Sequence, residues 1–347
     1  MNSPPEPPVR VPVSTPGDVI VVVPHLLGFH PQESLVILGL FGSSQRVRLA
    51  FRYDLPDPPD RDVAEAIGYH TAKHLRRQRL STAMVIGCGP GTLVTPVVDA
   101  VRRILAIDRV RLQDALRVDE GRWWSYMCTE PSCCPPCGLP VPGNSHPAAS
   151  ALAQAGLPAA ASRADLAATI APIGGPDAEA INLATEQAVT TVADDLAQLG
   201  QDAVRTRCLD IVQGAITTYR NGGSITDPAQ LARIAVALTS IEIRDDAWAR
   251  MDPAHHAVHA RLWTDLTCRA CPGTVAAPAA LLAFTAWQGG QGALANLALD
   301  RALADTPGYS MALLLRDALD AGAPPSAAVL PMTPEEVAAS YDARRRR

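Results

Sequence analysis

The pattern of apolar residues changes at Pro147, and this change constrains the fold of the 347-residue chain more than any other feature. Before Pro147, short apolar or alternating runs are interleaved with helical patterns. After it, Ala, Leu and Ile recur at helical spacing between Gly and Pro breaks, and no run is typical of a strand. The sequence therefore predicts an α+β or α/β fold, with a small N-terminal α/β layer on a mixed sheet followed by an all-helical C-terminal bundle.

The N-terminal half is expected to contain a first helix, a hairpin and two strand-and-helix units. Ser14 or Thr15 caps the first helix and Gly28 ends it, although the valines of this segment would also suit a strand. The other expected strands are Ser34–Phe41, Gln45–Tyr53, Thr82–Gly87, Leu112–Val118 and Arg122–Met127, and the other expected helices are Asp60–Arg79 and Thr92–Ala106.

Roughly eight helices are expected from Pro147 onward. One block, Ala279–Met311, has the spacing of a tetratricopeptide helical hairpin, although two packed Ala-rich helices would give the same pattern. We expect four segments: a disordered lead over residues 1–13, an α/β domain over 14–146, a helical domain over 147–323 and a partly flexible tail over 324–347. The residues that match the hairpin are Leu282, Ala283, Ala286, Gly290, Ala295, Leu299, Ala302 and Pro307.

The charge balance excludes some partners. A formal net charge of -5 and a pI near 5.9 give no basic surface for nucleic acid. The apolar run Val19–Leu27 is too short to span a bilayer, and the polar, proline-rich start does not resemble a signal peptide. We therefore expect a cytoplasmic protein without membrane or nucleic-acid partners. In that compartment, clustered cysteines favour metal or redox chemistry over structural disulfides.

Four of the eight cysteines lie in the aromatic, proline-rich stretch Gly121–Cys137. Thiolates at such short spacings are typical of tetrahedral zinc sites, but two adjacent cysteines rarely bind one ion. Two C-x2-C pairs, one in each half, offer another four-thiolate site that would join the halves. A reversible disulfide and plain free thiols remain alternatives, and His146 is a further candidate ligand. The candidate metal ligands are Cys128, Cys134, Cys137, Cys268 and Cys271.

Two N-terminal segments contain candidate binding residues. Gly87–Gly91 follows a strand and precedes a helix, so its glycines, Gly89 among them, would form a tight turn or admit a cofactor or an anion. His30, Glu33 and Ser34 would form a proton relay if they converged, but they also suit a plain helix-to-strand connection.

The segment Ile243–Asp265 concentrates polar and aromatic residues in the helical half. His255 and His259 are one turn apart on a helix and would bind a metal with a nearby aspartate, or pair with carboxylates instead. The candidate binding residues of this segment are Arg244, Asp245, Asp246, Trp248, His259 and Trp263, and those of the cysteine stretch are Trp124 and Tyr126.

Several motifs resemble the actinobacterial family called domain of unknown function 4192. The resemblance runs nearly end to end and implies a bacterial protein in which both halves belong to one unit, but it implies no activity, ligand or partner. The chain departs from the family pattern at Cys137, Cys268 and Cys271. The matching motifs are Pro24–Pro31 (PHLLGFHP), Glu33–Val36 (ESLV), Trp124–Pro136 (WSYMCTEPSCCPP), Arg244–Trp248 (RDDAW), Leu262–Asp265 (LWTD), Pro278–Phe284 (PAALLAF) and Gly308–Leu313 (GYSMAL).

Three functional hypotheses follow. The leading one is a non-enzymatic module that binds a protein partner or a small molecule through the aromatic-cysteine stretch and the Arg244–Asp265 segment. The second is an enzyme acting on a small metabolite, phosphorylated or not, near Gly89–Thr92, with its site between the halves and lined by His30, Asp245 or His259. The third is a protein that is stapled by zinc or that senses oxidants through its thiols.

Overall fold

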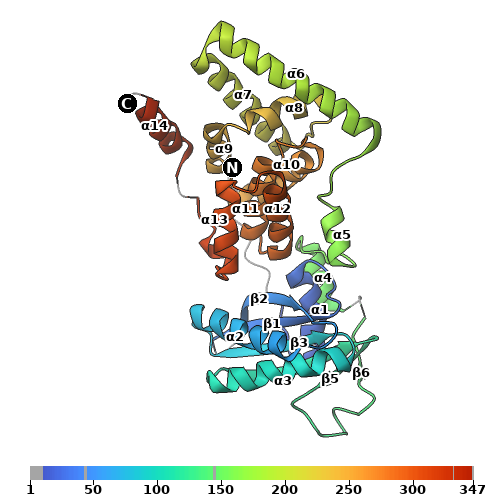
Figure 1. The fold of residues 1–347 in the computed structure, drawn as a ribbon. Coiled ribbons are helices and arrows are strands. Elements are labelled where there is room, and N and C mark those ends of the chain that lie inside the picture. Colours follow the sequence, from blue (N-terminus) through green and yellow to red (C-terminus); the bar gives the residue numbers. More distant parts are fainter. Residues whose placement is uncertain (1–10, 43–44, 144–145, 331, 346–347) are drawn as a thin grey trace. The chain divides into compact units, whose positions relative to one another are not determined.

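The computed structural model describes residues 11–42, 45–143, 146–330 and 332–345 and divides into two compact units (Figure 1). The first unit extends to Leu166 and includes residues 320–324, and the second contains residues 167–319 and the residues from 325 onward. The lead predicted over residues 1–13 lies outside the described residues except for 11–13. The compact units divide between 166 and 167, whereas the sequence analysis placed the boundary after residue 146.

The first unit is built on a mixed sheet, as the sequence predicted, but with six strands rather than the five expected, in the order β2-β1-β3-β4-β5-β6. Only β3 and β4 are parallel, and the other neighbouring strands are antiparallel. The helix α3 (Gly91–Ile107) makes the crossover between the two parallel strands, as parallel pairing requires. The strands are β1 (Ser34–Phe41), β2 (Arg46–Asp54), β3 (Thr82–Cys88), β4 (Arg111–Asp119), β5 (Arg122–Ser125) and β6 (Leu139–Pro140).

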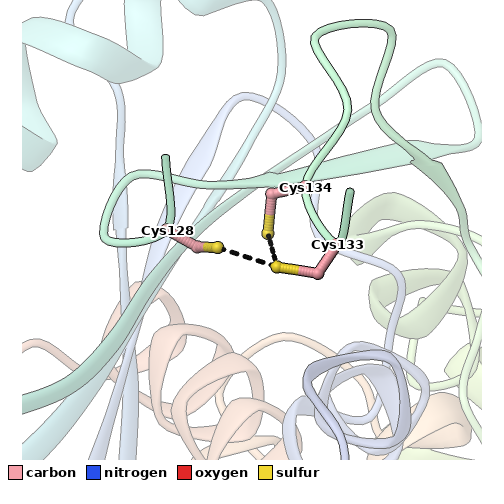
Figure 2. A group of neighbouring side chains, drawn as sticks. All are labelled: Cys128, Cys133 and Cys134. Atoms are coloured by element: carbon pink, nitrogen blue, oxygen red, sulfur yellow. Dashed lines mark hydrogen bonds between the residues drawn. The ribbon is translucent and has the colours of Figure 1, made fainter. Parts of the chain in front are cut away.

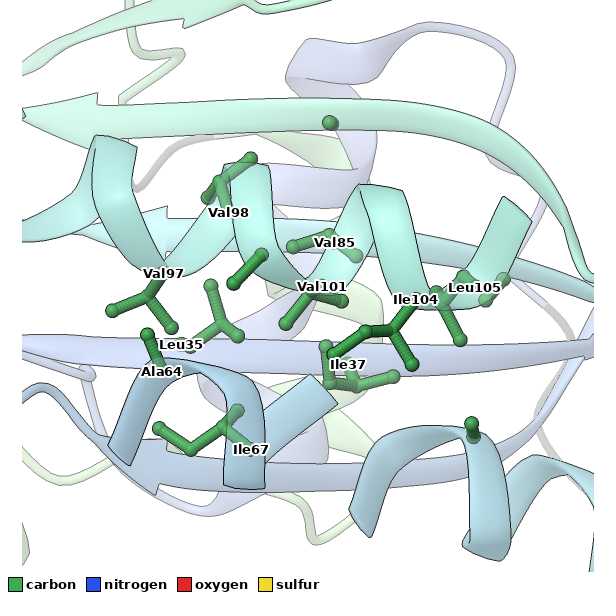
Figure 3. Packing of buried hydrophobic residues seen from close by; sticks show 14 of the residues in the cluster. Leu35, Ile37, Ala64, Ile67, Val85, Val97, Val98, Val101, Ile104 and Leu105 are labelled. Atoms are coloured by element: carbon green, nitrogen blue, oxygen red, sulfur yellow. The ribbon is translucent and has the colours of Figure 1, made fainter. Parts of the chain in front are cut away.

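The main core of this unit lies between one face of the sheet and two helices, α2 (Arg61–Arg77) and α3 (Gly91–Ile107) (Figure 3). Apolar side chains of β1, β3 and α3 interdigitate there. The two helices approach closely at Gly68 of α2, where a Cβ atom would lie 2.4 Å from Cδ1 of Ile104. The labelled side chains of this core include Leu35, Ile37, Val85, Val97, Val101 and Ile104.

The opposite face carries α1 (Pro16–Leu27), which packs against α4 (Pro147–Gln154). The segment is a helix and not the alternative strand because both of its ends are fixed. Thr15 and Asp18 form a reciprocal capping box at the start, and Gly28, with φ of 81°, ends the helix in the left-handed conformation. The short helix α5 (Arg163–Ala168) follows α4.

The second unit contains no strand among its described residues, and its regular elements are helices joined by turns. From residue 147 onward the described chain contains eleven α-helices rather than roughly eight. Breaks at Gly200 and at residues 238–240 were not recognised from the sequence, and one further helix lies in the segment predicted as a tail. The helices of this unit are α6 (Gly175–Leu199), α7 (Gln201–Arg220), α8 (Pro228–Ala237), α9 (Ile241–Ala249), α10 (His256–Arg269), α11 (Ala276–Gln288), α12 (Gly292–Asp305), α13 (Ser310–Asp320) and α14 (Pro334–Arg345).

The predicted helical hairpin is formed by α11 and α12. Its small residues are almost completely buried, with Ala283, Ala286 and Ala295 each no more than 1% exposed. Within the segment predicted as a tail, α14 contacts α9, because the Tyr341 hydroxyl donates a hydrogen bond of 2.7 Å to Asp245 and Arg345 pairs with Glu242 at 2.7 Å.

Candidate metal-binding cysteine site

The loop between β5 and β6 carries the cysteine cluster, and β5 holds the end of this loop. Nε1 of Trp124 donates a hydrogen bond of 3.0 Å to the carbonyl of Pro136. The Arg122 guanidinium donates to the carbonyls of Cys137 at 3.2 Å and Gly138 at 3.0 Å. Gly138 has a φ of +76°, and a Cβ atom there would lie 2.6 Å from the Trp124 ring, so only glycine fits this contact.

The start of the loop is fixed by a second set of hydrogen bonds. The Ser125 hydroxyl donates to Oδ1 of Asp114 at 2.8 Å and accepts from the backbone N–H groups of Met127 and Cys128. The Tyr126 hydroxyl lies 2.8 Å from Oγ1 of Thr95 on α3. Burial raises the pKa of Asp114. These contacts fix the backbone on which Cys128 stands.

Three thiols meet in the middle of this loop (Figure 2). The Sγ atoms of Cys128 and Cys133 are 3.1 Å apart, those of Cys133 and Cys134 are 3.8 Å apart, and all three lie within 4.8 Å of one another. The backbone N–H groups of Cys133 and Cys134 both donate to the carbonyl of Glu130, which turns the chain so that the adjacent cysteines face Cys128. In the described part of the chain this is the only group of three or more His, Cys, Asp or Glu residues close enough to share an ion.

The sulfur spacing is close to the spacing of thiolates on a tetrahedral zinc ion. A Zn–S bond is about 2.3 Å long, so two thiolates on one tetrahedral zinc ion lie about 3.8 Å apart. The Cys133–Cys134 distance of 3.8 Å already has this value, and the Cys128–Cys133 distance of 3.1 Å reaches it with a small rotation. The steric objection to two adjacent cysteine ligands therefore does not apply to this turn.

The thiols also influence one another's protonation. Hydrogen bonds from the thiols of Cys134 and Cys133 lower the pKa of Cys128. Each of these thiols is stabilised in its protonated form by its own hydrogen bond to Cys128. This bond raises the pKa of Cys133, and the corresponding bond raises the pKa of Cys134 to about 12. The first negative charge of the cluster is thus stabilised at Cys128, and a bound cation would replace the two remaining protons.

The other predicted ligands are placed elsewhere. Cys137 is exposed, and its Sγ lies 3.7 Å from the carbonyl of Gly138, outside the three-sulfur group. His146 caps α4 and lies 3.2 Å from Asp18. In the second unit, Cys271 is buried with its Sγ 3.0 Å from Oδ1 of Asn182, and Sγ of Cys268 lies 3.5 Å from the carbonyl of Thr169. A ligand role for Cys271 would require it to leave this interior.

The candidate residues at the start of β1 do not form a proton relay. The hydroxyl of Ser34 is buried, donates to the carbonyl of Gln32 and accepts from Nε of Arg52 at 2.7 Å. His30 and Glu33 are exposed. Gly89 packs against the backbone of Glu33, since a Cβ atom at Gly89 would lie 3.6 Å from Cα of Glu33. The turn after β3 is therefore tight.

The aromatic candidates are mostly structural. The Arg117 guanidinium lies 3.8 Å from the centroid of the Trp124 ring and covers one face of it in a cation–π contact. The indole N–H of Trp124 is bound to the carbonyl of Pro136 in the cysteine loop. Trp263 is completely buried, and Trp248 contacts Phe284 edge to face at 5.3 Å. A partner cannot touch Trp263 while the second unit is folded.

The polar candidates of α9 and α10 form internal contacts. Arg244 is 4% exposed, and its guanidinium donates to Asp245 at 2.7 Å and to the hydroxyl of Tyr309 at 3.1 Å. Asp246 is bound to Arg250 at 2.7 Å. This arrangement is the ion-pair network that the sequence left as an alternative.

The predicted histidine pair is not arranged as a metal site. Nε2 of His259 accepts from the backbone N–H of Asp252 at 3.3 Å, and His255 bonds the side chain of Asp252 at 2.9 Å. Burial lowers the pKa of His259 to about 4, so this imidazole is neutral at pH 7. The lone pair that a metal would need on Nε2 is already in use.

Sequence reasoning missed the polar residues that border a cavity on the α1 face of the sheet, among them His25 and Cys88. Cys88 ends a buried strand, and His25 lies in the last turn of a mostly apolar helix. Both positions were read as parts of turns and helix ends. A thiol at the carboxyl end of a parallel strand was the available signal, because ligands bind at that edge of such sheets.

The fold and the thiol cluster define a two-unit α+β protein with a cysteine loop that can accept a metal ion. The chain belongs to the family described as Domain of unknown function (DUF4192), whose model matches residues 16–326. The match includes the sheet, the cysteine loop and most of the helices. No curated protein and no solved structure matches the chain. Within the described residues, no helix combines the length and apolar character needed to cross a membrane.

Proposed function

We propose that this chain is a metal-binding protein whose β5–β6 loop holds one Zn²⁺ ion through the thiolates of Cys128, Cys133 and Cys134. The observation that carries the proposal is the convergence of three Sγ atoms within 4.8 Å on the thirteen-residue loop, residues 126–138, between β5 and β6. Zinc fits this donor set because soft thiolates select zinc or Cu(I) over magnesium and calcium. The proposal develops the third hypothesis from the sequence, a protein that binds zinc through its cysteines, with Cys133 in place of the ligands expected from the second unit.

Three protein ligands leave the fourth position of a tetrahedral ion open. The cluster is exposed to solvent, since Cys133 is exposed and Cys128 and Cys134 are only half-buried. Water or a donor atom of a bound molecule therefore has access to the ion. Closed structural sites use four protein ligands, so the proposed site is of the open kind.

Cobalt titration of the reduced full-length protein tests the proposal. Co²⁺ bound to thiolates gives charge-transfer absorption, and zinc should displace it. We expect about one metal ion per chain, with tetrahedral geometry. Cys134→Ser should weaken metal binding by more than about 100-fold, because it removes a metal ligand. Changing a residue that only hydrogen-bonds to a ligand costs about 10- to 100-fold in affinity.

Cys137→Ser is the matched control, since Cys137 lies three residues further along the same loop but outside the sulfur group. Its affinity for cobalt should equal that of the unsubstituted chain. Absence of thiolate absorption in the unsubstituted protein would refute the proposed function. Equal losses for Cys134→Ser and Cys137→Ser would refute the three-ligand set.

A further inference from the structure

A second site lies on the other face of the same sheet, where α1 and α4 cover the ends of β3 and β4. The cavity there has a volume of about 420 Å³. Its floor includes Ile86 and Cys88 from the end of β3 and Val118 from the end of β4. Small-molecule sites have volumes of about 300–1,000 Å³, and in open α/β sheets they lie at the carboxyl ends of parallel strands.

No Asp, Glu, Lys or Arg is among the described residues that line this cavity. Arg52 acts on Cys88 electrostatically, but it is paired with Asp54 and does not line the cavity. Burial raises the pKa of the Cys88 thiol to about 12, so this group is neutral at pH 7. His30 keeps an exposed side, but the partial loss of its hydration lowers its pKa, which favours the neutral ring at that pH. A charged ligand would lose its hydration here without gaining an ion pair, which favours an uncharged ligand.

One lining residue has a defined hydrogen-bonding role. Nδ1 of His25 lies 2.8 Å from the carbonyl of Leu157, and because a carbonyl only accepts, Nδ1 carries the hydrogen. In the neutral ring Nε2 is then a lone-pair acceptor, and no described residue donates a hydrogen bond to it. A donor group on a ligand in the cavity would satisfy this acceptor.

We propose that this cavity binds an uncharged, mostly apolar small molecule bearing a hydroxyl group, which donates a hydrogen bond to Nε2 of His25. The aliphatic side chains of α1 and the strand ends enclose the apolar body, and the thiol of Cys88 contacts it as a small apolar group. This site is independent of the cysteine loop.

Three related probes test the proposal by calorimetry on the full-length protein: 2-naphthol, 2-methoxynaphthalene, which has no donor, and 2-naphthoate, which is charged. We expect 2-naphthol to bind roughly five-fold more tightly than the methyl ether, as a net neutral hydrogen bond allows. The naphthoate should bind more than about ten-fold more weakly than 2-naphthol. The ¹⁵N resonance of Nε2 of His25 should move with 2-naphthol and stay in place with the ether.

A blocking variant locates the binding to the cavity. Ala153 is exposed and lines the cavity, so Ala153→Trp should fill its opening without disturbing the core and abolish probe binding. Ala151→Trp is the control on the same helix, because Ala151 is exposed but does not line the cavity. Equal binding by both variants, tighter binding of 2-naphthoate, or no saturable binding of 2-naphthol would overturn the inference.

Discussion

Replacing Trp263 with alanine is expected to destabilise the second unit by about 3–5 kcal/mol, the usual cost of removing a large buried aromatic side chain. Trp263 is completely buried on α10, and the apolar neighbours Leu262 and Leu266 on the same helix are each 1% exposed. Urea unfolding of the full-length protein, followed by the far-ultraviolet helix signal, measures the change in the free energy of unfolding.

Trp263→Phe is the matched comparison. It keeps an aromatic ring in the core and removes an indole N–H that is buried and has no hydrogen-bond partner among the described residues. We therefore expect a cost well below that of alanine, since no satisfied polar contact is lost. A Trp263→Ala protein as stable as the unsubstituted chain would mean that this side chain is available for a partner after all.

Gly138→Ala is expected to displace the cysteine loop and to weaken metal binding by at least about ten-fold, the scale of a lost outer-shell contact. The new Cβ would lie 2.6 Å from the Trp124 ring, and φ of +76° adds the strain of a left-handed conformation. The loop must then move away from the Trp124 ring and lose the contact that positions it. Cobalt titration measures the affinity, and tryptophan fluorescence reports the displacement.

Gly121→Ala is the control that separates the effect of the clash with Trp124 from the effect of the strained left-handed backbone. Gly121 has a nearly equal φ of +73°, but a Cβ atom there meets no other atom within 4 Å. This variant should lose some stability and keep its affinity for cobalt. If Gly121→Ala and Gly138→Ala weaken metal binding equally, the tryptophan contact does not position the cysteines.

The coarse fold was predictable because it depends on local periodicity. The hairpin β1–β2, the buried strand β3 and the helices α2 and α3 lie within a few residues of the predicted ranges, and the small residues of α11 and α12 are buried as their spacing indicated. The two-residue strand β6 was missed, because it exists only through its pairing with β5. The break between α8 and α9 has no Gly or Pro to mark it.

The candidate site was predictable only in part. The sequence identified the cysteine-rich stretch, but the spacing could not tell which thiols converge. That choice depends on the turn at Glu130, which brings Cys133 as well as Cys134 toward Cys128. Similarly, His255 and His259 were expected one turn apart on a single helix, but His255 ends the short 3-10 helix that precedes α10, and packing directs both rings to Asp252. The direction in which a side chain points depends on its neighbours in the folded protein, so the spacing of residues in the sequence does not determine it.

X-ray absorption spectroscopy of the zinc-loaded protein tests the central claim most directly, because it counts the atoms bound to the metal. We predict three sulfur atoms at about 2.3 Å and one lighter atom at about 2.0–2.2 Å. These sulfurs would belong to Cys128, Cys133 and Cys134, so Cys137→Ser should leave the spectrum unchanged. A first shell of four sulfur atoms, or one with fewer than three, would contradict the three-thiolate site.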